Sequence, residues 1–193
     1  MMVNQTKFKV LEKKCTACIK CSLSSTRQNL VFGRGNPNAN LFIIGEGPGQ
    51  QEDEQGLAFV GRAGKMLDNV FASVGIDTNK DCYISNIVKC RPPNNRKPLS
   101  KEVSECNPWL TEQIAMIKPK IIVLAGSTAV QSFLEINEPI SKLRGGWIIK
   151  DSMKCMPIFH PSYLLRNPSK EKGKPKWLTL QDLKTVKREL NSL

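Results

Sequence analysis

Four short apolar runs, separated by longer segments with helical spacing, constrain the fold of this chain more than any other feature. The apolar runs are Leu41–Gly45, Tyr83–Val88, Ile121–Ala125 and Met156–Phe159. Short runs that are mainly apolar, without alternation, are typical of strands buried on both faces. Helical periodicity is found in the segments Ala63–Val74, Lys101–Ile117, Ser127–Leu134 and Leu178–Leu190. Strands that alternate with helices predict βαβ units, so we expect an α/β fold with a mainly parallel sheet covered on both faces.

The length and composition are those of one domain. At 193 residues the chain can bury a sizeable core, and it shows no internal repeat or break in composition. We therefore expect a single domain over residues 1–193. No apolar run approaches the ~20 residues that cross a bilayer, and the polar N-terminal segment is unlike a signal peptide. These features predict a cytoplasmic protein with no membrane attachment.

The charge of the chain is strongly positive. Lys and Arg number 29 against 17 Asp and Glu, which gives a formal net charge of +12. Much of the excess lies between Lys142 and Arg188. Such a charge attracts polyanions, and nucleic acid is the commonest polyanion in the cytoplasm. On charge alone, a protein that is basic only for solubility remains an alternative.

Polar or glycine-rich residues lie in or directly after each of the four predicted strands. The first run leads into Gly45–Gly49, the second contains Asn86, the third leads into Gly126-Ser127, and the fourth into His160-Pro161-Ser162. The carboxyl ends of parallel strands meet at one edge of a sheet, which is where such folds bind ligands. The sequence therefore predicts one site at this edge.

The segment from residue 45 to residue 64 is rich in glycine, but its spacing matches neither a phosphate-binding loop nor a dinucleotide fingerprint. It places two carboxylates, Glu46 and Glu52, near Phe59. A carboxylate can orient a water molecule, and an aromatic ring can stack on a planar base. The alternative is a solvated acidic loop with Phe59 in the core.

His160 is the only histidine in the chain. A single histidine after an apolar run commonly has a structural role, but its position after a predicted strand favours a place in the site. There a neutral imidazole could donate a hydrogen bond to developing negative charge. With no second histidine, a hydrolytic zinc site of the usual kind is not expected.

The seven cysteines are an odd number, and three of them form a CxxCxxC run at Cys15, Cys18 and Cys21. With Cys90 and Cys106 they could supply four thiolates to a [4Fe–4S] cluster or to a structural zinc ion. Their spacing does not distinguish these two groups. Cys82 and Cys155 lie at the starts of apolar runs and are typical of free buried thiols.

Three motifs together resemble one known family. They are GEGPGQQEDEQGLAFVGRAG at 45–64, NIVKCRPPNNRKP at 86–98 and HPSYLLRNPS at 160–169. In this order they resemble the family-four uracil-DNA glycosylases, bacterial and archaeal enzymes with a [4Fe–4S] cluster, and the resemblance extends from about Cys18 to the C-terminus. It implies a three-layer α/β/α sandwich with a short, mainly parallel four-stranded sheet. The implied activity is hydrolysis of the bond between uracil and deoxyribose in single- or double-stranded DNA, which leaves an abasic site and starts base-excision repair. A monomer suffices for this chemistry.

The resemblance also implies the ligands of the cluster. In the family, CxxC is followed by a leucine and an arginine, and Leu23 and Arg27 stand at those positions after the second and third cysteines of the run. The implied ligands are Cys18, Cys21, Cys90 and Cys106. Cys15 is an additional thiol that could compete with them.

The remaining site residues are likewise implied by the resemblance. Phe59 would stack on the flipped uracil, Asn86 would read its Watson–Crick edge, and His160 would stabilise the uracil anion at O2. Glu46 and Gly47 would position the attacking water, and Glu52 would lie near the C5 edge, where a thymine methyl must be refused. Gly45 and Asn95 are further candidates for the substrate pocket.

The segment after His160 is expected to contact DNA. Ser162, Leu164, Leu165 and Arg166 would form a loop that enters the duplex where the base leaves, with the leucines as apolar wedges and the arginine on phosphate. The alternative is that both leucines belong to the core.

Three alternatives compete with a uracil-specific glycosylase. A protein that captures uracil-DNA without cleavage is disfavoured because the family members that bind covalently carry a basic insert with a histidine, absent from residues 90–100. A sister glycosylase with broader base specificity usually lacks carboxylates such as Glu46 and Glu52. A cluster-bearing DNA-binding module without an active site would make the convergence at the strand ends a coincidence.

Overall fold

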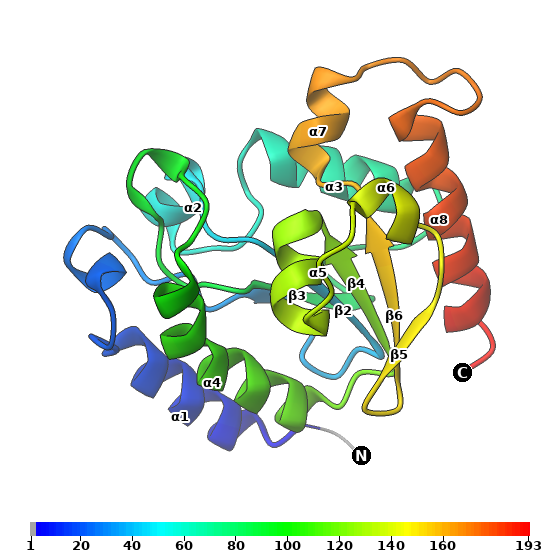
Figure 1. Ribbon diagram of the computed structural model, residues 1–193. Coiled ribbons are helices and arrows are strands. Elements are labelled where there is room, and N and C mark those ends of the chain that lie inside the picture. Colours follow the sequence, from blue (N-terminus) through cyan, green and yellow to red (C-terminus); the bar gives the residue numbers. More distant parts are fainter. Residues whose placement is uncertain (1–2) are drawn as a thin grey trace.

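The four predicted strands form the centre of one sheet. The computed structural model describes residues 3–193 (Figure 1). The central strands are β3 (Cys82–Asn86), β2 (Leu41–Gly45), β4 (Ile121–Ala125) and β6 (Met153–Ile158), parallel and hydrogen-bonded in that order. Every residue of β2, β3 and β4 is buried, which explains why β2 and β4 are apolar without alternation; β3 also buries two polar residues, Ser85 and Asn86.

Two short edge strands make the sheet six-stranded and mixed, so the prediction of a four-stranded sheet is wrong in this detail. Strand β1 (Arg34–Gly35) pairs antiparallel with β3, and β5 (Ile148–Lys150) pairs antiparallel with β6. Neither was predicted, because both are very short and neither is fully buried. A strand with few buried side chains leaves no apolar run in the sequence.

Helices cover both faces of the sheet, as expected. One face packs against α1 (Gln5–Thr16), α4 (Ser100–Ile117), α5 (Ser127–Leu134) and α6 (Ile140–Leu143). The other packs against α3 (Arg62–Ala72) and α8 (Pro175–Leu190), and the short helix α7 (Pro161–Arg166) contacts both of these. The segments predicted to be helical are confirmed within a few residues at each end.

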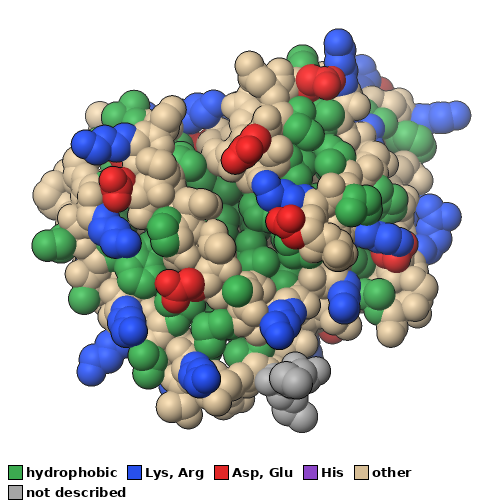
Figure 2. All heavy atoms as spheres, turned by 60° about the horizontal axis from the view of Figure 1, so that its bottom comes forward, with side chains coloured by type: hydrophobic (Ala, Val, Ile, Leu, Met, Phe, Trp, Pro, Cys, Tyr) green, Lys and Arg blue, Asp and Glu red, His purple; other side chains and the backbone are tan. Residues whose placement is uncertain are grey.

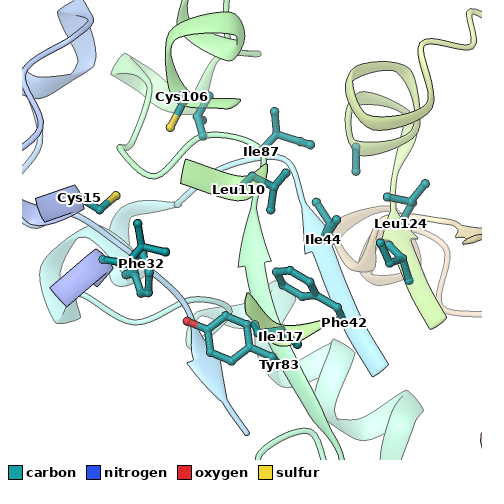
Figure 3. Packing of buried hydrophobic residues seen from close by; sticks show 14 of the residues in the cluster. Cys15, Phe32, Phe42, Ile44, Tyr83, Ile87, Cys106, Leu110, Ile117 and Leu124 are labelled. Carbon is teal, nitrogen blue, oxygen red and sulfur yellow. The ribbon is translucent and has the colours of Figure 1, made fainter. Parts of the chain in front are cut away.

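Side chains of successive strand residues point alternately into the two cores. Phe42 and Ile44 belong to the core under α1 and α4, whereas Leu41 and Ile43 belong to the core under α3 and α8. In the first core the rings of Phe8, Phe32, Tyr83 and Phe42 meet edge to face, with centroids 5.4–5.5 Å apart. Figure 3 shows Cys15 from α1 and Cys106 from α4 on one side of the labelled rings of Phe32, Phe42 and Tyr83.

Helix α1 was not predicted, because only a narrow stripe of this polar segment is apolar. Phe8, Leu11 and Cys15 are its buried residues, and the carboxamide oxygen of Asn4 caps its first turn by accepting from the backbone N–H of Lys7 at 3.0 Å. α1 packs against α4 (Figure 1). This packing brings the CxxCxxC run, which begins at Cys15 in α1, beside the helix that carries Cys106.

Charged side chains do not form one continuous stripe on the face of the molecule where α1 and α4 lie. Figure 2 shows Lys and Arg side chains standing apart there, with apolar patches and single acidic side chains between them. None of the helices among residues 3–193 is long and apolar enough to span a membrane.

Candidate active site

A pocket of about 420 Å³ lies at the carboxyl ends of the central strands, within the range usual for small-ligand sites. Its walls come from the loop after β2, the end of β3, the loop after Cys90 and the start of α7. The sequence-predicted residues that line it are Glu46, Gly47, Glu52, Phe59, Asn86, Asn95, His160, Ser162 and Arg166. Residues from three separate motifs thus meet at one place.

Phe59 lies in the loop between α2 (Gln50–Gln55) and α3, with a left-handed backbone (φ 53°) that non-glycine residues seldom adopt. Its ring is buried, 6.3 Å from the ring of His160 between centroids. Gly45 makes this position possible, because a Cβ there would lie 2.4 Å from Cζ of Phe59 and 2.5 Å from Oδ1 of Asn86. The glycine at the end of β2 therefore lets the ring and the amide meet.

Arg34 of β1 holds the backbone of Phe59. Its Nε donates to the carbonyl of Ala58 at 2.7 Å and its Nη2 to the carbonyl of Phe59 at 3.3 Å. The same guanidinium pairs with Asp68 of α3 and donates to Asn79 Oδ1 at 2.6 Å. Arg34 was not predicted as a site residue, since nothing near it in the sequence indicates a contact with residue 59.

The carboxylate of Glu52 is occupied by backbone donors. It accepts from the N–H groups of Gly61 (2.7 Å), Val60 (2.9 Å) and Gly49 (3.2 Å), the last as part of the capping box of α2. The segment around Glu52 is thus a helix with a satisfied acid rather than a solvated acidic loop. Its carboxylate ties together the two chain segments that flank the pocket.

Glu46 lines the same pocket as the first residue after β2. Its backbone carbonyl accepts from the N–H of Val88 at 3.2 Å, which fixes the main chain and leaves the carboxylate for the pocket. Gly47 follows, where a Cβ would lie 2.8 Å from the Val88 side chain. A side chain at residue 47 would therefore crowd this wall.

Asn86, at the end of β3, is 1% exposed. Its Oδ1 is the one buried side-chain oxygen or nitrogen among residues 3–193 without a hydrogen-bond partner. Leaving such an atom unpaired costs about 1–3 kcal/mol, so a ligand that donates to it recovers this energy. The pocket is thus prepared for a ligand with an N–H or O–H group at this point.

His160 is the N-cap of α7, and its Nδ1 accepts from the backbone N–H of Ser162 at 3.2 Å. Burial lowers its pKa from 6.5 to about 4, and the positive charge of Arg166 acts in the same direction, while Glu52 opposes them. The imidazole is therefore neutral at pH 7. Nδ1 also lies 2.7 Å from Ser162 Oγ, whose hydroxyl can donate to it. With Nδ1 as the acceptor of the Ser162 backbone N–H, we assign the proton to Nε2, which is free to donate.

The loop between Cys90 and α4 adds residues that sequence reasoning identified only in part. Asn95 Oδ1 accepts from Nε of Arg91 at 2.8 Å, within a turn where Asn94 and Asn95 both have φ 54°. Arg96 was not predicted, yet it lines the pocket and pairs with the buried Glu102 through two bonds of 2.6 and 2.8 Å. A fixed guanidinium thus stands at the rim.

The structure corrects the prediction for one residue of α7. Ser162 and Arg166 line the pocket, but Leu164 is fully buried. In this helix residues 161 and 164 are both buried, as expected three positions apart, so Leu164 is a core residue and not a wedge. Tyr163 is exposed, and Leu165 is half-buried.

A second, smaller pocket is lined by the four implied ligands Cys18, Cys21, Cys90 and Cys106. Three of the sulfurs receive hydrogen bonds, from Arg27 Nη1 to Cys90 (3.0 Å), Trp109 Nε1 to Cys18 (3.3 Å) and the backbone N–H of Lys89 to Cys106 (3.3 Å). Donors aimed at sulfur favour thiolates over thiols. Among residues 3–193, no three His, Cys, Asp or Glu side chains are placed to hold a single metal ion.

Cys15 does not line this pocket. Its thiol is fully buried in the core under α1, and burial raises its pKa to about 12. Burial also raises the pKa of Cys106, to about 11, so it is the position of Cys15 outside the pocket that distinguishes it from the four cysteines.

Comparisons with known proteins agree with this geometry. Residues 32–184 match the model of the uracil DNA glycosylase superfamily. The chain is 44% identical to the type-4 uracil-DNA glycosylase of Thermotoga maritima, over 91% of this chain and 88% of that protein. It is 39% identical to the type-4 enzymes of Archaeoglobus fulgidus (81% of this chain, 82% of that protein) and Saccharolobus solfataricus (91% and 82%). The chain belongs to the type-4 family of uracil-DNA glycosylases.

Proposed function

We propose that this chain removes uracil from DNA by hydrolysing its N-glycosidic bond, which leaves an abasic site for base-excision repair. The observation that carries the proposal is the unpaired amide of Asn86, buried in one pocket with Phe59 and a neutral His160. A base inside a duplex cannot be attacked, so the nucleotide swings out into this pocket.

Recognition of uracil rests on the amide of Asn86. An amide offers one acceptor and two donors, and uracil presents N3–H and O4 at matching positions. Cytosine presents an acceptor at N3 and a donor at N4, so both of its groups meet groups of the same polarity. The ring of Phe59 stacks on the flipped base. Uracil's C5 edge faces the wall that Glu52 fixes, where a thymine methyl has no room.

The hydrolysis builds negative charge on uracil and positive charge on the sugar. His160 acts on the uracil, and Glu46 acts on the water that attacks the sugar. As the N1–C1′ bond breaks, its electron pair stays on uracil, and Nε2–H of His160 donates to the developing anion at O2. Glu46 orients the water whose oxygen bonds to C1′ and accepts its proton, and Gly47 leaves space beside it. We assign this role to Glu46 rather than Glu52, because Glu52 already accepts three backbone N–H bonds.

The rim of the pocket holds the DNA. Arg166 and Ser162 of α7 meet the phosphates beside the flipped nucleotide, and Leu165 fills the vacated stack in place of the buried Leu164. Asn95 completes the wall opposite α7. The net charge of +12 adds a sequence-independent attraction to single- or double-stranded DNA.

We further propose that Cys18, Cys21, Cys90 and Cys106 hold a [4Fe–4S] cluster. The pocket they line fits it, since hydrogen bonds point at three of the sulfurs. A cluster separates its thiolates more widely than one tetrahedral zinc ion, whose four sulfurs lie at about 2.3 Å from the metal. When bound, the cluster cross-links the turn after α1 to the loop after β3 and to α4. No step of the hydrolysis requires electron transfer.

One copy of the chain supplies every residue of the pocket, so we propose that residues 1–193 act as a single domain and a monomer. We propose that it acts in the cytoplasm, on DNA that lies in the same compartment.

The test is cleavage of a duplex oligonucleotide with a single uracil by the cluster-loaded protein, followed by alkaline scission of abasic sites. Scission at the uracil, lost in Asn86→Ala and in His160→Ala, is the expected result. Tight binding of the same duplex without scission would instead indicate a protein that captures uracil-DNA, and would refute the proposed activity.

A further inference from the structure

Lys89 is a fully buried lysine that lies between the uracil pocket and the thiol pocket. Its Nζ donates to Ser85 Oγ (2.6 Å), Gln113 Oε1 (2.7 Å) and the carbonyl of Asn86 (2.8 Å). All three acceptors are neutral. Glu102 and Asp182, which are also buried, have arginine partners, whereas the ammonium of Lys89 has no acid within hydrogen-bond reach among the described residues.

A buried ammonium without a counter-charge is costly, because it loses its hydration and gains only dipoles in return. Negative charge is available on one side of Lys89. This residue lines the thiol pocket, and its backbone N–H donates to Cys106 Sγ at 3.3 Å. Four thiolates around an iron–sulfur core give that pocket a net negative charge. The negative charge of the bound cluster and its thiolates then neutralises the ammonium of Lys89.

On its other side, Lys89 supports the residue that reads uracil. Its ammonium holds the Asn86 carbonyl at the end of β3, together with the hydroxyl of Ser85. Gln113 of α4 completes this network, with Oε1 on the ammonium and Nε2 donating to the carbonyl of Phe32 at 2.9 Å. These bonds fix the main chain of Asn86 and leave its side-chain amide free for the ligand.

We propose that Lys89 is a positioning residue, the buried counter-cation of the cluster, and that the same ammonium fixes the end of β3 that presents Asn86. Loss of the cluster therefore loosens uracil recognition through this side chain. The inference rests on the proposed function, because it takes the cluster and the role of Asn86 from there.

Two variants separate the charge of Lys89 from its hydrogen bonds. Lys89→Met keeps most of the volume and removes both. Gln113→Glu leaves the bonds from the ammonium to Ser85 and to the Asn86 carbonyl in place, and it gives the ammonium a carboxylate partner, so that the lysine no longer neutralises the cluster. It also removes the bond from Gln113 Nε2 to the Phe32 carbonyl. Lys101→Met is the matched control, since Lys101 is an exposed lysine on α4, the helix that carries Cys106.

The first measurement is iron release from cluster-loaded protein to a chelator, followed by the loss of visible absorbance. We expect release to be about tenfold faster or more in Lys89→Met and in Gln113→Glu, the usual size of an outer-shell effect on metal affinity, and unchanged in Lys101→Met. The reduction potential of the cluster should also fall in both variants, because a nearby positive charge favours the added electron.

The second measurement compares KM and kcat for single-uracil DNA among samples with equal iron content. Lys89→Met should lose about tenfold or more in kcat/KM, whereas Gln113→Glu, which keeps the bond to Asn86, should lose much less. If Lys89→Met does not fold, iron release from Gln113→Glu decides. Release at the wild-type rate from that variant overturns the inference while leaving the glycosylase intact. Absence of uracil cleavage by wild-type protein would instead overturn the proposed function.

Discussion

Replacing Glu52 by glutamine should lower the free energy of unfolding more than it raises the activation free energy of the reaction, because Glu52 holds the main chain of the pocket. Its carboxylate accepts three backbone N–H bonds of 2.7, 2.9 and 3.2 Å. A glutamine oxygen can still serve Val60 and Gly61, but its NH2 group would face the N–H of Gly49. Bonds to a charged acceptor contribute about 1.5–3 kcal/mol against about 1 for neutral ones, and an unpaired buried donor costs about 1–3 kcal/mol.

These terms give an expected loss of about 2–4 kcal/mol for Glu52→Gln. For a chain of this length, such a loss lowers Tm by roughly 5–15 °C. Urea unfolding followed by circular dichroism measures the loss directly. The variant should keep measurable activity below its lowered Tm, with a kcat reduced by about tenfold through the loosened pocket.

Glu46→Gln is the paired experiment, because it removes a carboxylate from the same pocket without touching those bonds. Its stability should change by about 0.5 kcal/mol or less, while kcat falls by about 100-fold or more. The reverse pattern would refute the assignment: a stable but inactive Glu52→Gln together with an active Glu46→Gln.

Three further changes test other parts of the site. The unfolded chain takes up a proton at His160 with a pKa of 6.5, whereas the folded protein does so only at about 4. The folded state is therefore at full stability above pH 6.5 and loses stability as the pH falls from 6.5 towards 4. Urea unfolding at several pH values should show this loss in the wild type and a smaller one in His160→Gln. Gly45→Ala places a Cβ 2.4 Å from the Phe59 ring and should cost about 1–3 kcal/mol in stability and raise KM for uracil-DNA; an unchanged KM would show that the ring does not contact the base. Cys18→Ser should lose the visible absorbance of the cluster and Cys15→Ser should retain it, and the opposite result would exchange their roles.

The parts of the fold that the sequence predicted are those in which burial is continuous. Strands β2, β3 and β4 are buried at every residue, so β2 and β4 leave unbroken apolar runs and β3 leaves a run broken only at Ser85 and Asn86. β1 and β5 are held by pairing with a neighbouring strand and are only partly buried, and α1 buries one narrow stripe. Hydrogen bonding between main chains does not require apolar side chains, and a narrow buried stripe requires few of them. The sequence therefore did not predict β1, β5 or α1.

The same reasoning explains which site residues could be predicted. His160 follows one predicted strand and Asn86 lies within another, so the parallel order of the strands brings them to one edge of the sheet, although β3 ends at Asn86, two residues before the predicted end. The roles of Glu46 and Glu52 could not be separated in the sequence, since both are acids in one glycine-rich segment. Only the three N–H groups around Glu52 distinguish them. Leu164 was misassigned because the apolar pair 164–165 does not reveal which leucine faces the core.

Arg34 and Glu52 together account for the unusual backbone of Phe59. A left-handed conformation at a non-glycine residue costs of order 1–3 kcal/mol and persists only where the surroundings impose it. Here Arg34 holds the carbonyls of residues 58 and 59, and Glu52 holds the N–H groups of residues 60 and 61. Arg34 thus binds the peptides on both sides of Phe59, and Glu52, from a different element, binds the peptide after Phe59 with the opposite charge. Since the strain exists before any ligand arrives, the ring needs no rearrangement to receive a flipped base, and the binding free energy of the base is not reduced by ordering this loop.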